Sequence, residues 1–482
     1  MVMQTSQTSQ TLMAALGAVG LVLGASASAS AQTSRVGDVT FSKDIVPILQ
    51  RSCQSCHRPN SLAPMSLITY EEARPYARSI KQRTGLRHKQ GVMPPWFIEK
   101  NIGIQGFRDD ISLSEEEIQK IARWADNGAP QGNPADAPPA RVWAPDNGDW
   151  QIGKPDLVVD GPKITMKSIT PDWWGAHPDF PIPGLKEDRY VAAVEIREIN
   201  DSKGKPGRQT IGGLFIYHHA QMGVTGPDGK ANMMGGWPVH EVGRNADVYD
   251  PEAGKLLKAG STINFPTVHL HANGKESTAF LQIGLKFHPV GYKPKFQVRG
   301  VQVGSGDLDI PGSTAGVTKV AYSTLNQPVK LTVFEPHMHA TGVRMCLDAI
   351  YGSHEETLNC SGYDHSWVKV YYYDEDSAPL LPKGTILRVT GYFDNTPANK
   401  NVVDPRNWSG LGHRSIDNML IMIGQGVHLT DEEYAQEVAR RRAKRQITEG
   451  QVTPGCPACS YAQLPKPRPM PGAGAAAGGQ QQ

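Results

Sequence analysis

Histidines occur in close pairs at three places in the chain, and a methionine follows the last pair. The residues are His218-His219, His269 with His271, His337 with His339, and Met419. Imidazole suits copper, zinc or iron, and a thioether among the ligands favours copper. A lone histidine is more often structural than a ligand, but an ordered series of pairs is not easily a coincidence. The pattern therefore predicts metal sites, with copper as the favoured metal.

The spacing within each pair limits how two imidazoles reach one ion. His337 and His339 alternate with one other residue, so on a strand both imidazoles project from the same face. His218 and His219 are adjacent, so on a regular strand they point to opposite faces. They can hold one metal only if the backbone bends or if one imidazole binds through Nδ1.

A second chemical motif, C-x-x-C-H, comprises Cys53, Cys56 and His57. Two thiols one helical turn apart can form thioethers with the vinyl groups of haem, and the adjacent histidine then reaches the iron. A redox C-x-x-C or half of a zinc site is the alternative interpretation. We expect a covalent c-type haem, because no thioredoxin-like βαβ pattern surrounds the motif and the other C-x-x-C lies near the C-terminus.

The sixth iron ligand is expected to be a methionine, whose soft thioether raises the haem potential. Met93 lies in the sequence GVMPPW, where two prolines stiffen the loop. Met65 is the competing candidate, but it lies only eight residues after His57. Met93 is therefore the predicted ligand.

The N-terminus predicts export. Residues 12–24 form an apolar run that is short for a membrane span, and the small residues after it end in Ala29-Ser30-Ala31, a signal-peptidase type of site. The first ten residues lack Lys and Arg, so an uncleaved anchor is the alternative. No later stretch is apolar enough for a membrane span, and a net charge of +2 offers no field for nucleic acid. We expect a periplasmic or secreted protein, cleaved near Ala31, with no stable membrane insertion.

Local patterns predict the elements that position these groups. Capping boxes at Thr69, Ser114 and Thr430 predict helices. Short β-branched and aromatic runs separated by turn residues predict strands from residue 155 onward. The expected parts are a signal peptide 1–31, a haem domain 38–130, a Pro-rich linker 131–154, two β-sandwiches 155–308 and 309–429, and a C-terminal helix with a disordered tail 430–482.

Two family resemblances rest on these motifs. Residues 40–128 resemble the small monohaem cytochrome c domain fused to periplasmic bacterial enzymes, through VTFSKDIVPIL, MPPW and LSEEEIQKIARWADNGAP. Residues 155–430 resemble the copper type II, ascorbate-dependent monooxygenases, which include peptidylglycine alpha-hydroxylating monooxygenase and dopamine beta-monooxygenase, through the series HH, H-x-H, H-x-H and D-x-M. The resemblances imply a multidomain fold, with an all-α cytochrome c domain followed by two jelly-roll-like β-sandwiches. Each sandwich would hold one copper, and the two coppers would face each other across a solvent-filled cleft.

The second resemblance also implies ligands and roles. The first copper would be held by His218, His219 and His269, the last of which precedes Asn273-Gly274-Lys275-Glu276, with His271 and His288 as alternatives. The second copper would be held by His337, His339 and Met419. The second copper would bind dioxygen and attack the substrate C–H bond, and the first would store and deliver an electron. Ascorbate supplies the electrons in the animal enzymes, and here the haem is expected to pass them on from a periplasmic donor.

Three positions depart from the peptide-hydroxylating members of that family. Glu335 stands where an arginine binds the substrate carboxylate, and Ile421 and Ile423 replace an asparagine and a tyrosine. Peptidylglycine is therefore a poor candidate substrate. Glu335 could meet a cationic or hydroxylated substrate, or it could be solvated or paired within its strand.

Four further cysteines are expected to pair in an exported chain. Cys346 and Cys360 flank a predicted hairpin, which favours a structural disulfide. Cys456 and Cys459 lie beyond the predicted folded region, where we favour a small disulfide loop over a redox pair or a copper-loading site.

The sequence thus predicts an exported dicopper monooxygenase with one c-type haem, which hydroxylates an sp³ C–H bond of a small organic substrate with O₂. A non-oxygenating periplasmic electron-transfer or copper-binding protein and a haem-linked dehydrogenase are the alternatives.

Overall fold

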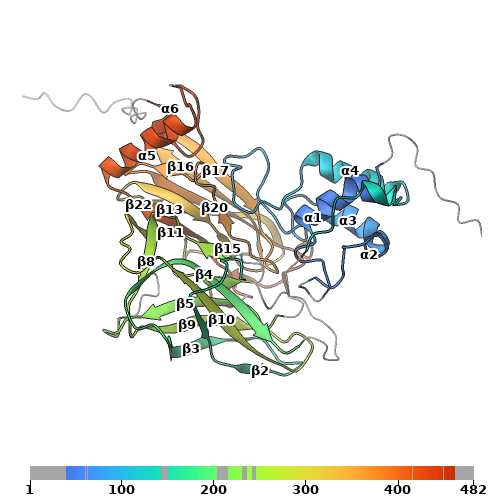
Figure 1. Cartoon of the computed structure of the whole chain (residues 1–482), viewed down its shortest axis with the longest axis horizontal. Helices are drawn as coiled ribbons and strands as arrows, with labels where there is room; N and C mark the ends of the chain where they lie inside the picture. Colours follow the sequence, from blue (N-terminus) through green and yellow to red (C-terminus); the bar gives the residue numbers. More distant parts are fainter. Residues whose placement is uncertain are drawn as a thin grey trace, which may run out of the picture. The chain divides into compact units, whose positions relative to one another are not determined.

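The computed structural model describes residues 39–59, 61, 63–142, 150–202, 215–230, 236–241, 246–414, 416–448 and 450–461 (Figure 1). The predicted signal peptide and the predicted tail after residue 461 lie outside the described residues. Within the described ranges, no helix is long and apolar enough to cross a membrane.

Short helices precede the strands. They are α1 (Val46–Ser52), α2 (Tyr70–Ala73), α3 (Ala77–Thr84) and α4 (Glu115–Asp126), with single turns η1 (Phe41–Ile45), η2 (Arg74–Tyr76) and η3 (Pro134–Asp136). The predicted capping boxes of Thr69 and Ser114 are confirmed at the starts of α2 and α4. Apolar side chains such as Leu49, Ile121 and Trp124 form a small core between these helices.

The expected all-α cytochrome c domain is wrong. Among the described residues, far more lie in strands than in helices, and the α-helices before residue 150 are four to twelve residues long. Ile98 and Phe107, from the expected helical domain, instead form isolated bridges with Ser361 and Tyr373. Both are buried in the same apolar core as the later strands. These side chains bury their apolar surface against a sheet, and the remaining helices are too short to enclose a separate all-α domain.

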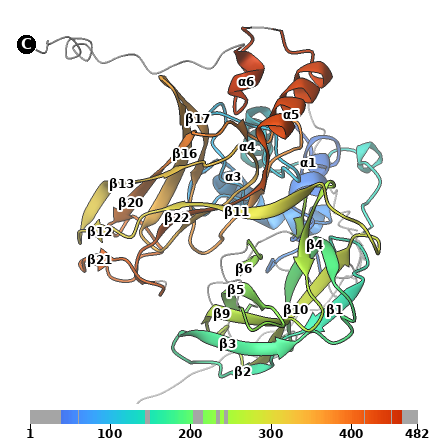
Figure 2. The same cartoon turned by 90° about the vertical axis from the view of Figure 1, so that its left-hand side faces the viewer.

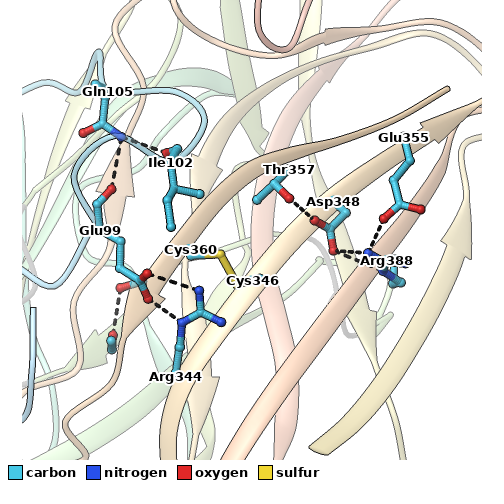
Figure 3. The surroundings of a disulfide bond; sticks show 12 residues. Glu99, Ile102, Gln105, Arg344, Cys346, Asp348, Glu355, Thr357, Cys360 and Arg388 are labelled. Carbon is cyan, nitrogen blue, oxygen red and sulfur yellow. Dashed lines mark hydrogen bonds and ion pairs between the residues drawn. A yellow bond between two sulfur atoms is a disulfide. The ribbon is translucent and has the colours of Figure 1, made fainter.

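Polar contacts also attach this segment to the strands (Figure 3). Arg344 of β16 forms an ion pair with Glu99, and one of its hydrogen bonds to that carboxylate is 3.1 Å long. The backbone N–H of Phe97 donates to the hydroxyl of Tyr371 over 3.1 Å. The residues from Trp96 to Phe107 therefore pack as part of the second β region described below.

The first β region consists of two sheets that share a core. Its strands are β1 (Leu157–Asp160), β2 (Ile164–Met166), β3 (Trp173–Pro181), β4 (Arg189–Asn200), β5 (Tyr217–Thr225), β6 (Val239–Glu241), β7 (Asp247–Val248), β8 (Ala253–Leu257), β9 (Thr262–Leu270) and β10 (Ser277–Phe287). One sheet runs β1-β10-β4-β8, and the other runs β3-β9-β5-β6, whose strands are labelled in Figure 2. Inward side chains of both sheets, including Val194, Phe265 and Ile283, form one cluster. This arrangement is consistent with a β-sandwich.

The second β region has the same kind of layering. Its strands are β11 (Phe296–Gly304), β12 (Asp309–Ile310), β13 (Thr314–Thr324), β14 (Val329–Phe334), β15 (Pro336–Met338), β16 (Gly342–Tyr351), β17 (His354–Gly362), β18 (Tyr371–Tyr372), β19 (Leu380–Leu381), β20 (Ile386–Asn395), β21 (Ser409–Gly410) and β22 (Leu420–His428). The main sheets run β11-β22-β14-β18 and β13-β20-β16-β17. Strand β11 pairs with β22 along most of its length and with β8 only at Phe296 and Gln297, so it joins the ladders of the two regions.

Both predicted disulfides are confirmed. Cys346 and Cys360 are directly paired residues of β16 and β17 (Figure 3). Helix α5 (Asp431–Lys444) has the predicted capping box of Thr430 and leads to α6 (Pro457–Ser460). The Cys456–Cys459 disulfide does not lie beyond the folded region, as expected, but is fully buried in the first core cluster. The chain folds back after α5, and the carbonyl of Gly455 accepts a hydrogen bond from the N–H of Leu380.

Candidate metal centre

Strands β5 and β9 position the first histidine group. The register of this strand pair shifts between Tyr217 and His219, which places a bulge at His218. A bulge adds one residue to a strand and re-aims a side chain, which is the backbone bend that the adjacent pair requires. His219 lies opposite His269 in the register, and the His218 and His269 ring centroids are 4.8 Å apart. The three imidazoles each offer a ring nitrogen within 4.8 Å of the others.

The three candidates for the third ligand of the first histidine group, His269, His271 and His288, differ in their contacts. His269 Nε2 lies 2.9 Å from Asp172 Oδ2, and a carboxylate in this position orients a ligating imidazole. The His271 ring is 5.7 Å from that of His218, but its Nε2 is 3.0 Å from the carbonyl of Phe215. His288 contacts the carbonyl of Ala253 and stacks on Tyr292, away from the other histidines. The geometry therefore favours His269.

Strand β15 and the residue after it carry the second histidine group. β15 pairs with β22, with His337 opposite Ile421 and Met338 opposite Leu420. His339 directly follows β15 and Met419 directly precedes β22, so the two residues flank the last registered pair, Met338 and Leu420. The His337 and His339 rings are 5.6 Å apart, and Met419 is half-buried. Strand pairing thus brings the three residues into neighbouring positions.

The two histidine groups meet in one buried cluster. The ring centroids of His219 and His337 are 6.4 Å apart. These side chains and those of His218, His269 and His339 are all buried. The expected solvent-filled cleft does not separate them, because the ladder that runs from β8 through β11 to β22 joins the two β regions.

His365 belongs to the same cluster and was not predicted. It lies in the loop between β17 and β18, and its ring centroid is 4.9 Å from that of His218 and 5.5 Å from that of His339. In the sequence it is a single histidine in YDHSW, without a second ligand at a fixed spacing. Only the tertiary fold brings it to the other imidazoles.

Two buried carboxylates complete the cluster. Glu241 of β6 lies opposite His219 in the register, and its Oε1 is 3.3 Å from His337 Nδ1. Glu241, Glu335 and His337 form a second group with metal-binding geometry. Glu335 is only 1% exposed, so it lies beside the histidines rather than at an open substrate surface. Glu241 was not predicted, since a lone glutamate on a three-residue strand carries no motif.

Burial keeps most of these imidazoles neutral. Desolvation, followed by the neighbouring imidazoles, lowers the pKa of His218, His219 and His365 well below the ordinary value. Desolvation also lowers the pKa of His339 to about 3. At His337 burial acts in the same direction, but the hydrogen bond and the charge of Glu241 outweigh it and raise the pKa. The neutral imidazole is the form that binds a metal ion.

The cluster fits a bound metal. His218 Nε2, His337 Nδ1, His339 Nδ1 and His365 Nε2 are buried and have no hydrogen-bond partner among the described residues. An unsatisfied buried polar atom costs about 1–3 kcal/mol, so four in one cluster require an explanation. A metal ion would satisfy these nitrogens, and imidazoles with one thioether form a donor set suited to copper.

Helix α1 leads directly into the C-x-x-C-H motif. The N–H groups of Cys56 and His57 donate to the carbonyl of Cys53, which folds the motif into one turn, and neither cysteine forms a disulfide. His57 Nδ1 lies 3.2 Å from the carbonyl of Met65, which leaves Nε2 as the nitrogen able to bind iron. The backbone of Met65 thus lies beside the imidazole ring. The choice between Met93 and Met65 as the second iron ligand stays a prediction.

A cavity of about 600 Å³ is lined by Met93 together with Trp96 and Ile118. This volume is typical of ligand and cofactor sites. Lys369 Nζ lies 5.8 Å from the Trp96 ring, and burial lowers the pKa of Lys369 to about 8, while the nearby Cys56 acts in the opposite direction. The cavity is lined by Met93 but not by Cys53, Cys56 or His57.

No family model matches the chain, and no curated protein matches it.

Proposed function

We propose that the chain is an exported dicopper monooxygenase that hydroxylates an sp³ C–H bond of a small organic substrate with O₂, with electrons supplied through a c-type haem. One observation carries the proposal. Histidines from two β regions converge in a buried cluster whose ring nitrogens include four without a hydrogen-bond partner in the described protein.

Two sets of residues would hold the two copper ions. The first set is His218, His219 and His269, and the second is His337, His339 and Met419. Copper supplies one-electron redox chemistry and a position for dioxygen when it is bound. The single thioether of Met419 is a weak donor that favours the reduced metal. The surrounding burial excludes water, and Asp172 and Glu241 orient imidazoles of the two sets.

The C-x-x-C-H motif would hold the haem. Cys53 and Cys56 would form the thioethers, while His57 and Met93 would bind the iron. The haem supplies one electron at a time from a periplasmic donor when it is bound. The segment after Met93 packs on the second β region through the Trp96 and Tyr371 rings, whose centroids are 5.1 Å apart. The motif is thus tied to the strands that carry the histidines.

The cellular compartment of the protein is inferred from its disulfides and from the proposed haem attachment. Two disulfides fit an oxidising compartment. Covalent haem attachment and the predicted signal peptide then favour the periplasm, or secretion, after cleavage near Ala31.

A copper-binding electron-transfer protein without oxygen chemistry is the second candidate. The burial of the histidine cluster favours it, because the imidazoles offer little surface to a substrate. Oxygen consumption separates the two functions. Substrate-dependent O₂ uptake by the copper-loaded protein supports the monooxygenase, and its absence across a screen of organic substrates supports electron transfer.

Metal analysis of the full chain, purified with its haem, tests the monooxygenase proposal directly. We expect two copper ions per haem, and one copper or none contradicts the proposal. Met419→Leu should abolish substrate-dependent O₂ uptake while copper stays at the first set. Met422→Leu is the matched control, because Met422 is a core residue of β22 and this exchange conserves volume.

A further inference from the structure

The loop between β17 and β18 carries a histidine to which neither sequence motif assigns a role. His365 is buried, and its Nε2 has no hydrogen-bond partner among the described residues. We propose that His365 is a further copper ligand, located between the two predicted ligand sets. This inference rests on the proposed function, because it assumes that copper is the resident metal.

The position of His365 is the first argument. Its ring centroid lies 4.9 Å from that of His218 in the first set and 5.5 Å from that of His339 in the second. His218 Nε2 and His339 Nδ1 are themselves buried without hydrogen-bond partners. His365 therefore neighbours an imidazole with an unsatisfied nitrogen in each set.

The hydrogen bonding of His365 is the second argument. The hydroxyl of Tyr363 lies 3.3 Å from His365 Nδ1, and the same hydroxyl donates to the carbonyl of Met338, the residue between His337 and His339. With its hydrogen committed to that carbonyl, the Tyr363 oxygen accepts from Nδ1–H. Nε2 is then the nitrogen with a free lone pair, which is the form that a metal requires.

The third argument is that hydrogen bonds of Asp364 fix the conformation of the loop. One carboxylate oxygen of Asp364 accepts hydrogen bonds from the backbone N–H of Ser366 and the side chain of Asn401, both 3.0 Å long. The other accepts from the N–H of Gly91 over 2.9 Å. A ligand fixed in advance loses little entropy on binding metal. A purely structural histidine would not need an anchored loop that leaves its own ring nitrogen unsatisfied.

Substitution by phenylalanine separates a ligand from a structural residue. Phenylalanine keeps the ring shape and removes the unsatisfied nitrogen, so the copper-free His365→Phe protein should be as stable as the wild type in urea. Removing even an outer-shell partner of a metal ligand costs about 10–100-fold in affinity. Loss of a direct ligand should therefore weaken copper binding by about 100-fold or more.

The measurement is a competition titration of the full haem-containing chain with a chromophoric Cu(I) chelator. His288→Phe is the matched control, because His288 is a histidine outside the cluster. The control should bind copper like the wild type. His365→Gln gives a second reading if the phenylalanine variant does not fold, since glutamine can still bond to Tyr363 but is a poor copper ligand.

The outcomes separate the inference from the function on which it rests. A loss of about 100-fold at His365 with an unchanged control supports the inference. Copper affinity within about threefold of the wild type in a folded His365 variant overturns the inference and leaves the two-copper function standing. A wild-type chain that binds no copper overturns both.

Discussion

Glu241 offers the sharpest test of how the β regions cooperate at the metal centre. It comes from β6 of the first β region, yet its Oε1 lies 3.3 Å from Nδ1 of His337 in the second. A carboxylate that accepts the Nδ1 proton orients the ring and makes the other nitrogen a better ligand. We predict that Glu241→Gln weakens copper binding at the His337 set and leaves the His218 set occupied.

The size of the effect follows from the contact. A hydrogen bond to a charged group contributes about 1.5–3 kcal/mol, which corresponds to roughly 10–150-fold in a binding constant. His337 Nδ1 and Glu241 Oε1 are 3.3 Å apart and form an ion pair that does not have hydrogen-bond geometry, so we expect the lower end of that range, about 10-fold. The copper-free variant should not lose stability, because Glu241 and Glu335 are two carboxylates buried in one group.

A Cu(I) competition titration measures the weaker of the two binding constants, and urea unfolding of the copper-free protein measures stability. Glu195→Gln is the control, since Glu195 is also buried but lies on β4, where it accepts the N–H of Ile152. If Glu241→Gln binds both copper ions as tightly as the control, the carboxylate does not orient His337 and the reasoning fails.

Three further predictions concern other parts of the chain. Cys53→Ala/Cys56→Ala should lose all covalently bound haem in a pyridine haemochrome assay, and retained haem would refute the attachment site. Cys346→Ala/Cys360→Ala should lower the free energy of unfolding by about 3 kcal/mol, because the disulfide closes a loop over a separation of 14 residues; urea midpoints equal to the wild type would contradict this. Glu198 accepts hydrogen bonds from the N–H groups of Ile216 and Tyr217 just before His218, and burial raises its pKa to about 7. That value lies above an unfolded pKa of about 4.3, so the contribution of Glu198 to stability is full below about pH 4.3 and is lost as the pH rises through about 7. The urea midpoint of the wild type should therefore fall between about pH 4 and 7 relative to that of Glu198→Gln and then level off, and parallel curves would contradict this sign.

Local features of the fold could be predicted because they depend on neighbours in the sequence. The capping boxes of Thr69, Ser114 and Thr430 are all present, since a cap joins residues only three apart. The sequence predicted that His218 and His219 can hold one metal ion only if the backbone bends or if one imidazole binds through Nδ1, and the structure has a bulge at His218. These predictions needed no knowledge of the distant chain.

The all-α cytochrome c domain failed for the opposite reason. Short helices and a C-x-x-C-H motif predicted a separate helical domain. The aromatic residues that follow the motif instead pack against a different part of the chain. Trp96 and Phe107 bury against Tyr371 of the second β region, with ring centroids 5.1 and 5.8 Å from it. Burial does not depend on sequence distance, so no local pattern reveals which surface a segment will cover.

The sequence by itself determined the kinds of ligand and their local spacing, because the residue type alone decides whether a side chain offers an imidazole, a thiol or a thioether. The tertiary structure alone decided that two histidine sets form one cluster and that His365 and Glu241 join it. These side chains come from β5, β6 and β9 of the first β region and from β15 and nearby loops of the second, which are distant in the sequence. Contacts between strands and loops assemble a metal site. The sequence around a single histidine or glutamate therefore does not indicate which other ligands lie beside it in the folded protein.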